Sequence, residues 1–180
     1  MPVRLLVQGG PYRGLGRADI GRRARAMLRA LQLEDSELSV VLTGDDQIQD
    51  MNRIYRKKDR PTDVLAFAQG EGEPSLAAGL LGDVVVSVPT ARRQARARGR
   101  PLLAEVTMLL AHGLLHLVGW DHETAAKDRR MRREVQRLCR AADAAVPVRT
   151  APSGRGAART RPRARAMREI GRNTQHRPAR

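Results

Sequence analysis

Three of the four histidines of this 180-residue chain fall in one stretch, His112-Gly113-Leu114-Leu115-His116-Leu117-Val118-Gly119-Trp120-Asp121-His122. Positions four residues apart lie on one face of an α-helix, so His112 and His116 are expected to point the same way. Gly119 is expected to end the helix, because glycine readily adopts the left-handed conformation, and the turn brings His122 back toward the pair. The stretch therefore predicts a helix that presents three imidazoles together.

Three neutral imidazoles are a ligand set that suits zinc, and three protein ligands leave one tetrahedral position for water. That arrangement is typical of a catalytic zinc site rather than of a closed structural one. The alternative is that the histidines are ordinary polar residues of a helix. The residues between them are mostly apolar, however, and buried imidazoles need partners for their ring nitrogens. We therefore predict one zinc ion per chain, bound by His112, His116 and His122.

This stretch is expected to continue a longer buried helix that begins near Pro101, since proline suits a first helical turn. Apolar side chains recur on one face of the helix at Leu103, Val106, Leu110, Leu114 and Leu117. The opposite face, within about 60° of arc, carries Glu105, Leu109, His112 and His116. We predict that the first face packs on the core and that the second faces the metal.

Hydrophobic periodicity outside this helix predicts four strands and four further helices. The strands are expected at residues 3–7, 38–42, 63–67 and 83–88, and the last is expected to be buried on both faces. The further helices are expected from an N-cap at Asp19 to Leu31, from Asp45 to about Tyr55, over 90–99 and over 124–142. The predicted fold is α+β: a small, mostly parallel or mixed four-stranded sheet packed with about five helices, with the metal site on a buried helix.

The chain is strongly basic, with 34 Lys and Arg against 19 Asp and Glu and a net charge of +15. From Pro147 onward the composition changes to ten arginines and one glutamate in 34 residues, without an apolar period. We therefore predict one domain over residues 1–146 and a disordered arginine-rich tail over residues 147–180. The charge favours a polyanionic partner, which is either nucleic acid or an anionic membrane surface.

The cysteine count and the hydropathy of the chain indicate the cellular compartment of the protein. Cys139 is the only cysteine, which excludes a disulfide framework and a zinc site built from several thiolates and favours a reducing cytoplasm. We expect this thiol to pack beside the core residues of the last helix. Near the N-terminus the only apolar run, Leu5-Leu6-Val7, is too short for a signal segment or a membrane span. These features predict a cytoplasmic protein that does not enter the membrane.

A basic loop, Tyr55-Arg56-Lys57-Lys58-Asp59-Arg60-Pro61, follows the second predicted helix. Proline pushes the residue before it out of the helical region, so the loop is expected to end there. Such a loop can hold a phosphate group, and the alternative is a solvated charged turn. Within the loop, Arg56 offers a planar guanidinium fork that suits two phosphate oxygens.

Four blocks carry a family resemblance: the histidine stretch, Tyr55-Arg56-Lys57-Lys58-Asp59, Pro61-Thr62-Asp63-Val64-Leu65 and Leu81-Gly82-Asp83. Over residues 1 to about 142 the chain resembles the YbeY-type bacterial ribosomal RNA maturation ribonucleases. The resemblance implies a zinc-dependent, single-strand-specific endoribonuclease. It implies that the substrate is ribosomal RNA, notably the end of the small-subunit RNA, and that the small ribosomal subunit is a partner. It also implies a role in ribosome quality control. It also assigns His112, His116 and His122 as metal ligands and Arg56 as a functional arginine.

The general base is left open by the sequence. A zinc ion lowers the pKa of its bound water to roughly 7 and polarises a phosphoryl oxygen, and both effects would assist phosphodiester cleavage. Gly113 stands where the metalloprotease motif His-Glu-x-x-His has its glutamate. Glu105, two turns before His112, is one candidate base, and a structural role is its alternative. Asp121 is a second candidate, and its alternative is to cap the turn.

Two other functions remain open: a metal-dependent hydrolase of peptides or small amides, and a non-catalytic, ribosome-associated RNA-binding protein with structural zinc. The missing glutamate and the positive charge weigh against the first. The second requires a fourth protein ligand, from Asp121 or Cys139. With one Phe, one Trp and two Tyr, the chain offers few stacking platforms for bases, so RNA binding is expected to be mainly electrostatic.

Overall fold

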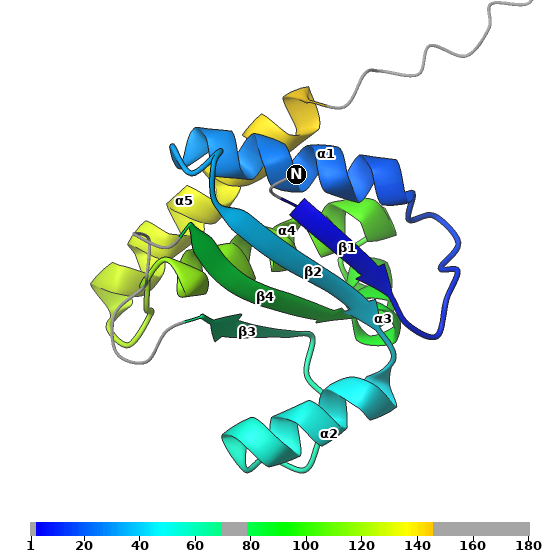
Figure 1. Cartoon of the computed structure of the whole chain (residues 1–180). Coiled ribbons are helices and arrows are strands. Elements are labelled where there is room, and N and C mark those ends of the chain that lie inside the picture. Colours follow the sequence, from blue (N-terminus) through cyan, green and yellow to red (C-terminus); the bar gives the residue numbers. More distant parts are fainter. Residues whose placement is uncertain (1–2, 70–78, 146–180) are drawn as a thin grey trace, which may run out of the picture. The chain divides into compact units, whose positions relative to one another are not determined.

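Four strands form one mixed sheet in the order β1-β2-β4-β3 in the computed structural model, which describes residues 3–69 and 79–145 (Figure 1). The strands are β1 (Val3–Val7), β2 (Glu37–Thr43), β3 (Val64–Ala68) and β4 (Leu80–Ser87). The pairs β1–β2 and β2–β4 are parallel, and the edge strand β3 runs antiparallel to β4. The predicted small, mostly parallel sheet is confirmed, whereas the predicted tail over 147–180 lies outside the described residues.

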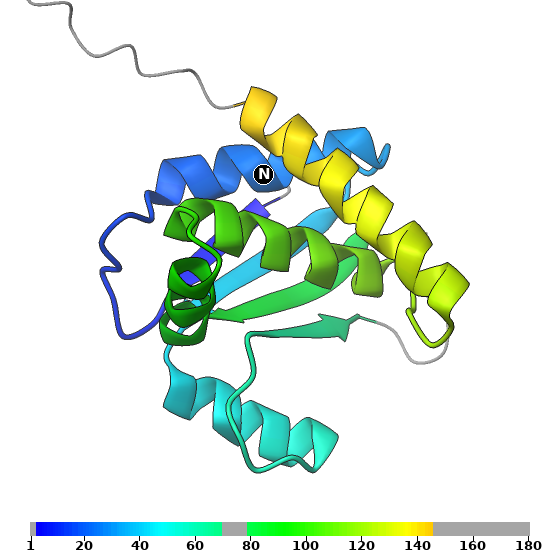
Figure 2. The same cartoon turned by 180° about the vertical axis from the view of Figure 1, so that it is seen from behind.

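Five helices accompany the sheet: α1 (Arg17–Ala30), α2 (Asp45–Arg56), α3 (Val88–Ala97), α4 (Leu102–Leu117) and α5 (Ala125–Ala144). Helices α1 and α4 cover one face of the sheet and α5 packs across both of them, as the reverse view in Figure 2 shows. Helix α2 lies apart from them and packs on the other face. The α+β fold is thus confirmed, with the helices divided unequally between the two faces.

Side-chain alternation along β4 separates two apolar clusters. Val84 and Val86 are fully buried in the large core beneath α1 and α4. Val85, which points the other way, is buried with Leu65 and Ile48 under α2. The prediction that this strand is buried on both faces is therefore confirmed. The second cluster is small, so α2 covers its face of the sheet only in part.

The fourth strand begins at Leu80 rather than at residue 83, and two further predicted boundaries are wrong for local reasons. Asp19 is not an N-cap, because α1 begins after Gly16 and Asp19 lies in its first turn, where it pairs with Arg22. Val88 does not end the fourth strand but starts α3, since the Ser87 hydroxyl accepts a hydrogen bond from the Thr90 N–H and caps that helix.

Asp45 connects α2 to the junction between β4 and α3. Its carboxylate accepts hydrogen bonds from the buried Ser87 hydroxyl, from Thr90 Oγ1 at 2.7 Å and from Arg93 Nη1 at 2.8 Å. Burial alone would raise the pKa of Asp45, but these three donors hold it below its ordinary value. The network fixes the start of α2, the helix that carries Arg56 at its other end.

Candidate metal centre

Helix α4 lies against the sheet through a close contact at Gly113. A Cβ at this position would lie 2.6 Å from Val84 Cγ1 and 3.2 Å from Val64 Cγ2, which is too close for any larger residue without displacement. Position 113 therefore faces the sheet, while His112 and His116 are only half-buried. A glutamate at 113 would point into the core, so this helix could not present the metalloprotease base in the usual place.

The turn after α4 has the geometry of a Schellman motif. Gly119 adopts φ 85°, its N–H donates to the His116 carbonyl at 3.1 Å, and the Trp120 N–H donates to the Leu115 carbonyl at 3.0 Å. The left-handed glycine reverses the chain and returns His122 to the side of α4. The turn that the sequence predicted at Gly119 is therefore present.

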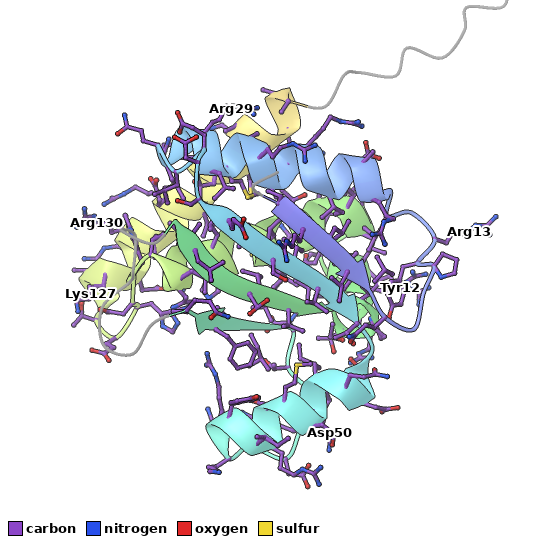
Figure 3. The ribbon with its side chains drawn as sticks, viewed as in Figure 1. Tyr12, Arg13, Arg29, Asp50, Lys127 and Arg130 are labelled. Carbon is purple, nitrogen blue, oxygen red and sulfur yellow. The ribbon has the colours of Figure 1, made fainter. Side chains whose placement is uncertain are left out.

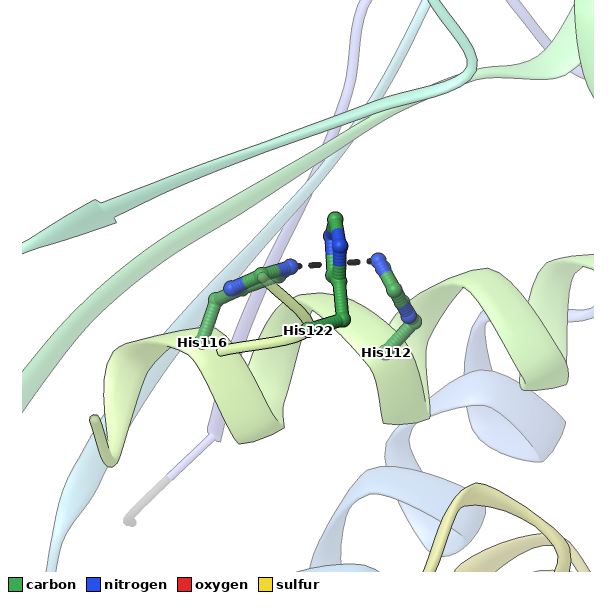
Figure 4. A group of neighbouring side chains, drawn as sticks. All are labelled: His112, His116 and His122. Carbon is green, nitrogen blue, oxygen red and sulfur yellow. Dashed lines mark hydrogen bonds between the residues drawn. The ribbon is translucent and has the colours of Figure 1, made fainter. Parts of the chain in front are cut away.

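Three imidazoles meet beside α4, as Figure 4 shows. One ring nitrogen from each of His112, His116 and His122 lies within 4.8 Å of the other two. The Nε2 atoms of His112 and His116 are 3.1 Å apart. Two nitrogens bound at 2.0–2.1 Å to a tetrahedral zinc ion would be about 3.3–3.4 Å apart, so the observed spacing fits a shared ion after a small adjustment.

The electrostatics of the cluster favour neutral imidazoles, which is the form that binds metals. Burial lowers the pKa of His112, and the neighbouring His116 and His122 lower it further. Burial also lowers the pKa of His116, followed by His122 and, more weakly, by the positive charge of Arg56. The chemistry of this donor set therefore fits a borderline divalent ion such as zinc.

No fourth protein ligand joins the three histidines among residues 3–69 and 79–145. Asp121 instead accepts hydrogen bonds from Lys127 Nζ at 2.7 Å and the Glu123 N–H at 3.2 Å. The hydrogen bond from Lys127, followed by that from the Glu123 N–H, lowers the pKa of Asp121. Both hydrogen bonds stabilise the turn after α4. Cys139 packs against the core on α5, and burial raises the pKa of its thiol.

Glu105 is held away from the histidines. Its side chain is completely buried and forms ion pairs with Arg98 and Arg100 at the start of α4. Leu109, one turn further along, is also buried. The face of α4 that was expected to meet the metal is thus open only in its C-terminal half. The two guanidinium partners favour the structural role for Glu105 over the role of general base.

Replacing Glu105 with glutamine should therefore lower stability more than catalysis. We expect a loss of about 1–3 kcal/mol in the free energy of unfolding, because two arginines lose a buried partner. The rate of a reaction at the histidine site, per folded molecule, should stay within about twofold, whereas loss of a general base typically costs about 10²–10⁴-fold. Urea unfolding and a single-turnover rate measure the two effects. Glu134→Gln, which removes an ion pair with Arg137 on α5, is the matched control.

Arg56 lies at the C-terminal end of α2, where its side chain is exposed. It forms no ion pair with any residue in the described part of the chain. Its charge nonetheless acts on His116, which lies on α4 on the other side of the sheet edge. Arg56 is thus available to an anion that approaches the histidines.

Two carboxylates near His112 were not singled out from the sequence. The charges of Asp63 and Asp128 both act to raise the pKa of His112, against the larger effect of burial. Asp63 precedes β3 and accepts a hydrogen bond from Gln94 Nε2 at 3.0 Å, while Asp128 pairs with Arg132 on α5. The two carboxylates come from different segments, one before β3 and one in α5. Of the two, only Asp63 could have been suspected from the sequence, because it lies inside a block that carries the family resemblance.

Comparison with known proteins identifies a consistent set of relatives. A sequence model of the family described as Endoribonuclease YbeY matches residues 17–143. The chain is 50% identical over 119 residues to Endoribonuclease YbeY of Anaeromyxobacter dehalogenans, an alignment that covers 66% of this chain and 61% of that protein. It is 46% identical over 117 residues to Endoribonuclease YbeY of Aquifex aeolicus, covering 65% of this chain and 77% of that protein.

Among solved structures, the fold resembles the solution structure of TM1509 from Thermotoga maritima with a TM-score of 0.56. That likeness covers 78% of this chain and 88% of that one at 24% sequence identity, and it supports the fold alone. Among the described helices, none combines the length and the apolar character that a membrane crossing requires.

Proposed function

The chain belongs to the Endoribonuclease YbeY family, and on that premise we propose that it is a metal-dependent endoribonuclease that cleaves single-stranded RNA. We further propose that its substrate is ribosomal RNA, processed near the end of the small-subunit RNA in the cytoplasm. A role with the small subunit in ribosome quality control belongs to the same proposal. The observation that carries it is the group of three imidazole nitrogens within 4.8 Å of one another.

The roles of the chain's own residues follow from their positions. His112, His116 and His122 would hold one zinc ion, which when bound supplies a Lewis acid for water and for a phosphoryl oxygen. Arg56 would donate its guanidinium fork to the phosphate and stabilise the charge that develops during cleavage. Burial keeps His112 and His116 neutral and available as ligands. Lys127 and the turn around Asp121 would hold His122 in place.

A polyanionic substrate is supported by the surface of the protein as well as by its net charge of +15. Arg13 and Arg29 extend outward from separate elements, as Figure 3 shows, and the exposed Arg130 lies over the ring of Trp120. Cations distributed in this way attract a phosphate backbone without reading its sequence. Recognition of a particular RNA site would then depend on the ribosomal context or on contacts close to the histidines.

The two alternative functions are less well supported. A peptide hydrolase of the His-Glu-x-x-His type needs a carboxylate base at position 113, where the structure has room only for glycine. A structural zinc site needs a fourth ligand, and neither Asp121 nor Cys139 joins the histidine group. An open ligand position is what a catalytic site requires.

The proposed function is tested with purified full-length protein, zinc and a labelled oligonucleotide. We expect cleavage of single-stranded RNA that stops with a chelator and returns with added zinc, and much slower cleavage of the same sequence in a duplex. A 2′,3′-cyclic end on the product would identify the RNA 2′-hydroxyl as the nucleophile. Stoichiometric zinc with intact RNA under all these conditions would instead favour the RNA-binding alternative, and cleavage of casein would favour the peptidase.

A further inference from the structure

A groove lies between α2 and the face of the sheet that the other helices leave open. It encloses about 520 Å³, within the range of about 300–1,000 Å³ that is typical of small-ligand sites. Met51 and Tyr55 of α2 form one wall, and Phe67 of β3 and Asp83 of β4 line the sheet side. The groove continues the small apolar cluster beneath α2, so its inner part is apolar.

An aromatic pair forms one side of the groove. The rings of Tyr55 and Phe67 meet edge to face, with centroids 4.9 Å apart and planes at 64°. Tyr55 is 66% exposed, so most of its ring contributes nothing to the core. The sequence predicted few stacking platforms, yet two of the chain's four aromatic residues come together here. An exposed ring braced by a second ring is a surface on which a flat heterocycle can stack.

The polar groups of the groove discriminate between ligand types. Asp83 pairs with Phe67 across the strands and shares its face of the sheet, and Gln69 Nε2 donates to Asp83 Oδ2 at 3.4 Å. A carboxylate here would repel a phosphate but accept hydrogen bonds from a base amino group. The exposed cations of residues 56–60 lie just beyond Tyr55. The charge pattern therefore fits a nucleotide with its base inside and its phosphate at the rim.

The groove lies close to the histidines across the edge of the sheet. Tyr55 immediately precedes Arg56 at the C-terminal end of α2. On the other side, Val64 of the edge strand β3 contacts the Gly113 position of α4, next to His112. The edge strand β3, which itself carries Phe67, thus lies between Tyr55 and the histidines, and a flexible RNA strand passing over that edge would meet both.

We propose that this groove binds one unpaired nucleobase of the RNA, stacked on Tyr55, while a neighbouring phosphate lies at Arg56 and the histidines. The inference rests on the proposed endoribonuclease function and adds a reason for single-strand selectivity, because a base within a duplex is not free to enter the groove. Asp83 accepts from an exocyclic amino group, so adenine, cytosine or guanine is preferred to uracil.

The test uses single-stranded RNA oligonucleotides that carry 2-aminopurine at successive positions, mixed with full-length protein in the presence of a chelator. We expect fluorescence quenching at one position beside the cleavage site. Tyr55→Ala should abolish the quenching and weaken binding by roughly 5- to 150-fold, the usual effect of one stacked base. Tyr55→Phe should retain both, and Ile54→Ala, which removes another exposed apolar side chain of α2, should change neither.

Because this readout needs no cleavage, it separates the two proposals. If the zinc-loaded wild type does not cleave RNA, the proposed function is overturned, while position-specific quenching would still support the base site. Equal binding of the single strand by the wild type and Tyr55→Ala would overturn the base site. The base site would also be overturned if Tyr55→Ala lost as much affinity for duplex RNA, or for an oligonucleotide abasic at that position, as for the intact single strand. Sedimentation showing a dimer that Tyr55→Ala dissociates would likewise overturn it, because the groove would then be an interface between copies of this chain.

Discussion

Replacing His116 with alanine should reduce the metal content from about one ion per chain to near zero and abolish RNA cleavage. His116 supplies one of the three imidazoles, and its Nε2 lies 3.1 Å from that of His112. Two imidazoles without the third leave a site that is too poor in ligands to compete for zinc against water or buffer. Elemental analysis after dialysis and single-turnover cleavage are the two measurements.

A thermal readout keeps the His116→Ala prediction independent of activity. Added zinc should raise the melting temperature of the wild type, because a ligand bound only by the folded state contributes about 2.7 kcal/mol at a hundred times its dissociation constant. The same addition should leave the variant unchanged. His176→Ala, outside the histidine stretch, should behave as wild type. Full zinc occupancy in the His116→Ala protein would show that the ligand assignment is wrong.

The clustering of the three histidines was predictable because its determinants are local in the sequence. The four-residue spacing of His112 and His116 depends only on helix geometry, and Gly119 acts through the conformation of a single residue. The strands were predictable in the same way, from the apolar runs in their sequences. Local patterns of this kind survive folding whenever no tertiary contact competes with them, and here α4 is buried enough to be unambiguous.

The features that the sequence did not reveal depend on contacts between elements. The partners of Glu105 are Arg98 and Arg100, which reach it because the chain turns at Gly99 between α3 and α4. The helical projection correctly put Glu105 on the histidine face, but it carried no information about which side chains would neutralise it. The antiparallel direction of β3 likewise follows from packing. The apolar run of a strand looks similar in the sequence whether the strand pairs parallel or antiparallel with its neighbour.

The groove beside α2 shows the same limitation at a functional surface. Tyr55 and Phe67 belong to different elements, and their ring contact requires α2 to pack beside β3. The sequence offered only a count of aromatic residues, which understated the stacking surface. The position of Arg56, by contrast, was well indicated, because a cation at the end of an amphipathic helix and the start of a basic loop is bound to be exposed.

Replacing Arg56 with alanine should leave the fold and the metal in place and reduce RNA cleavage by about 10²-fold or more. The fold should survive because the side chain is exposed and makes no ion pair with the described residues. Cleavage should fall because a guanidinium aimed at the phosphate stabilises the charge that develops in the transition state, and removing one such donor typically costs about 10²–10³-fold. Single-turnover rates with zinc-loaded protein measure this effect.

Arg53→Ala is the matched control, because Arg53 lies about one turn earlier on α2, carries the same charge and pairs with Asp50 at 2.7 Å. Its rate should stay within about twofold of the wild type, since a general loss of surface charge weakens RNA association only slightly. Arg56→Lys should fall between the two, because an ammonium group keeps the charge but not the two-pronged geometry. Equal rates for Arg56→Ala and Arg53→Ala would reduce Arg56 to one more solvated cation, and the phosphate would then have to be held by the neighbouring lysines or by the metal alone.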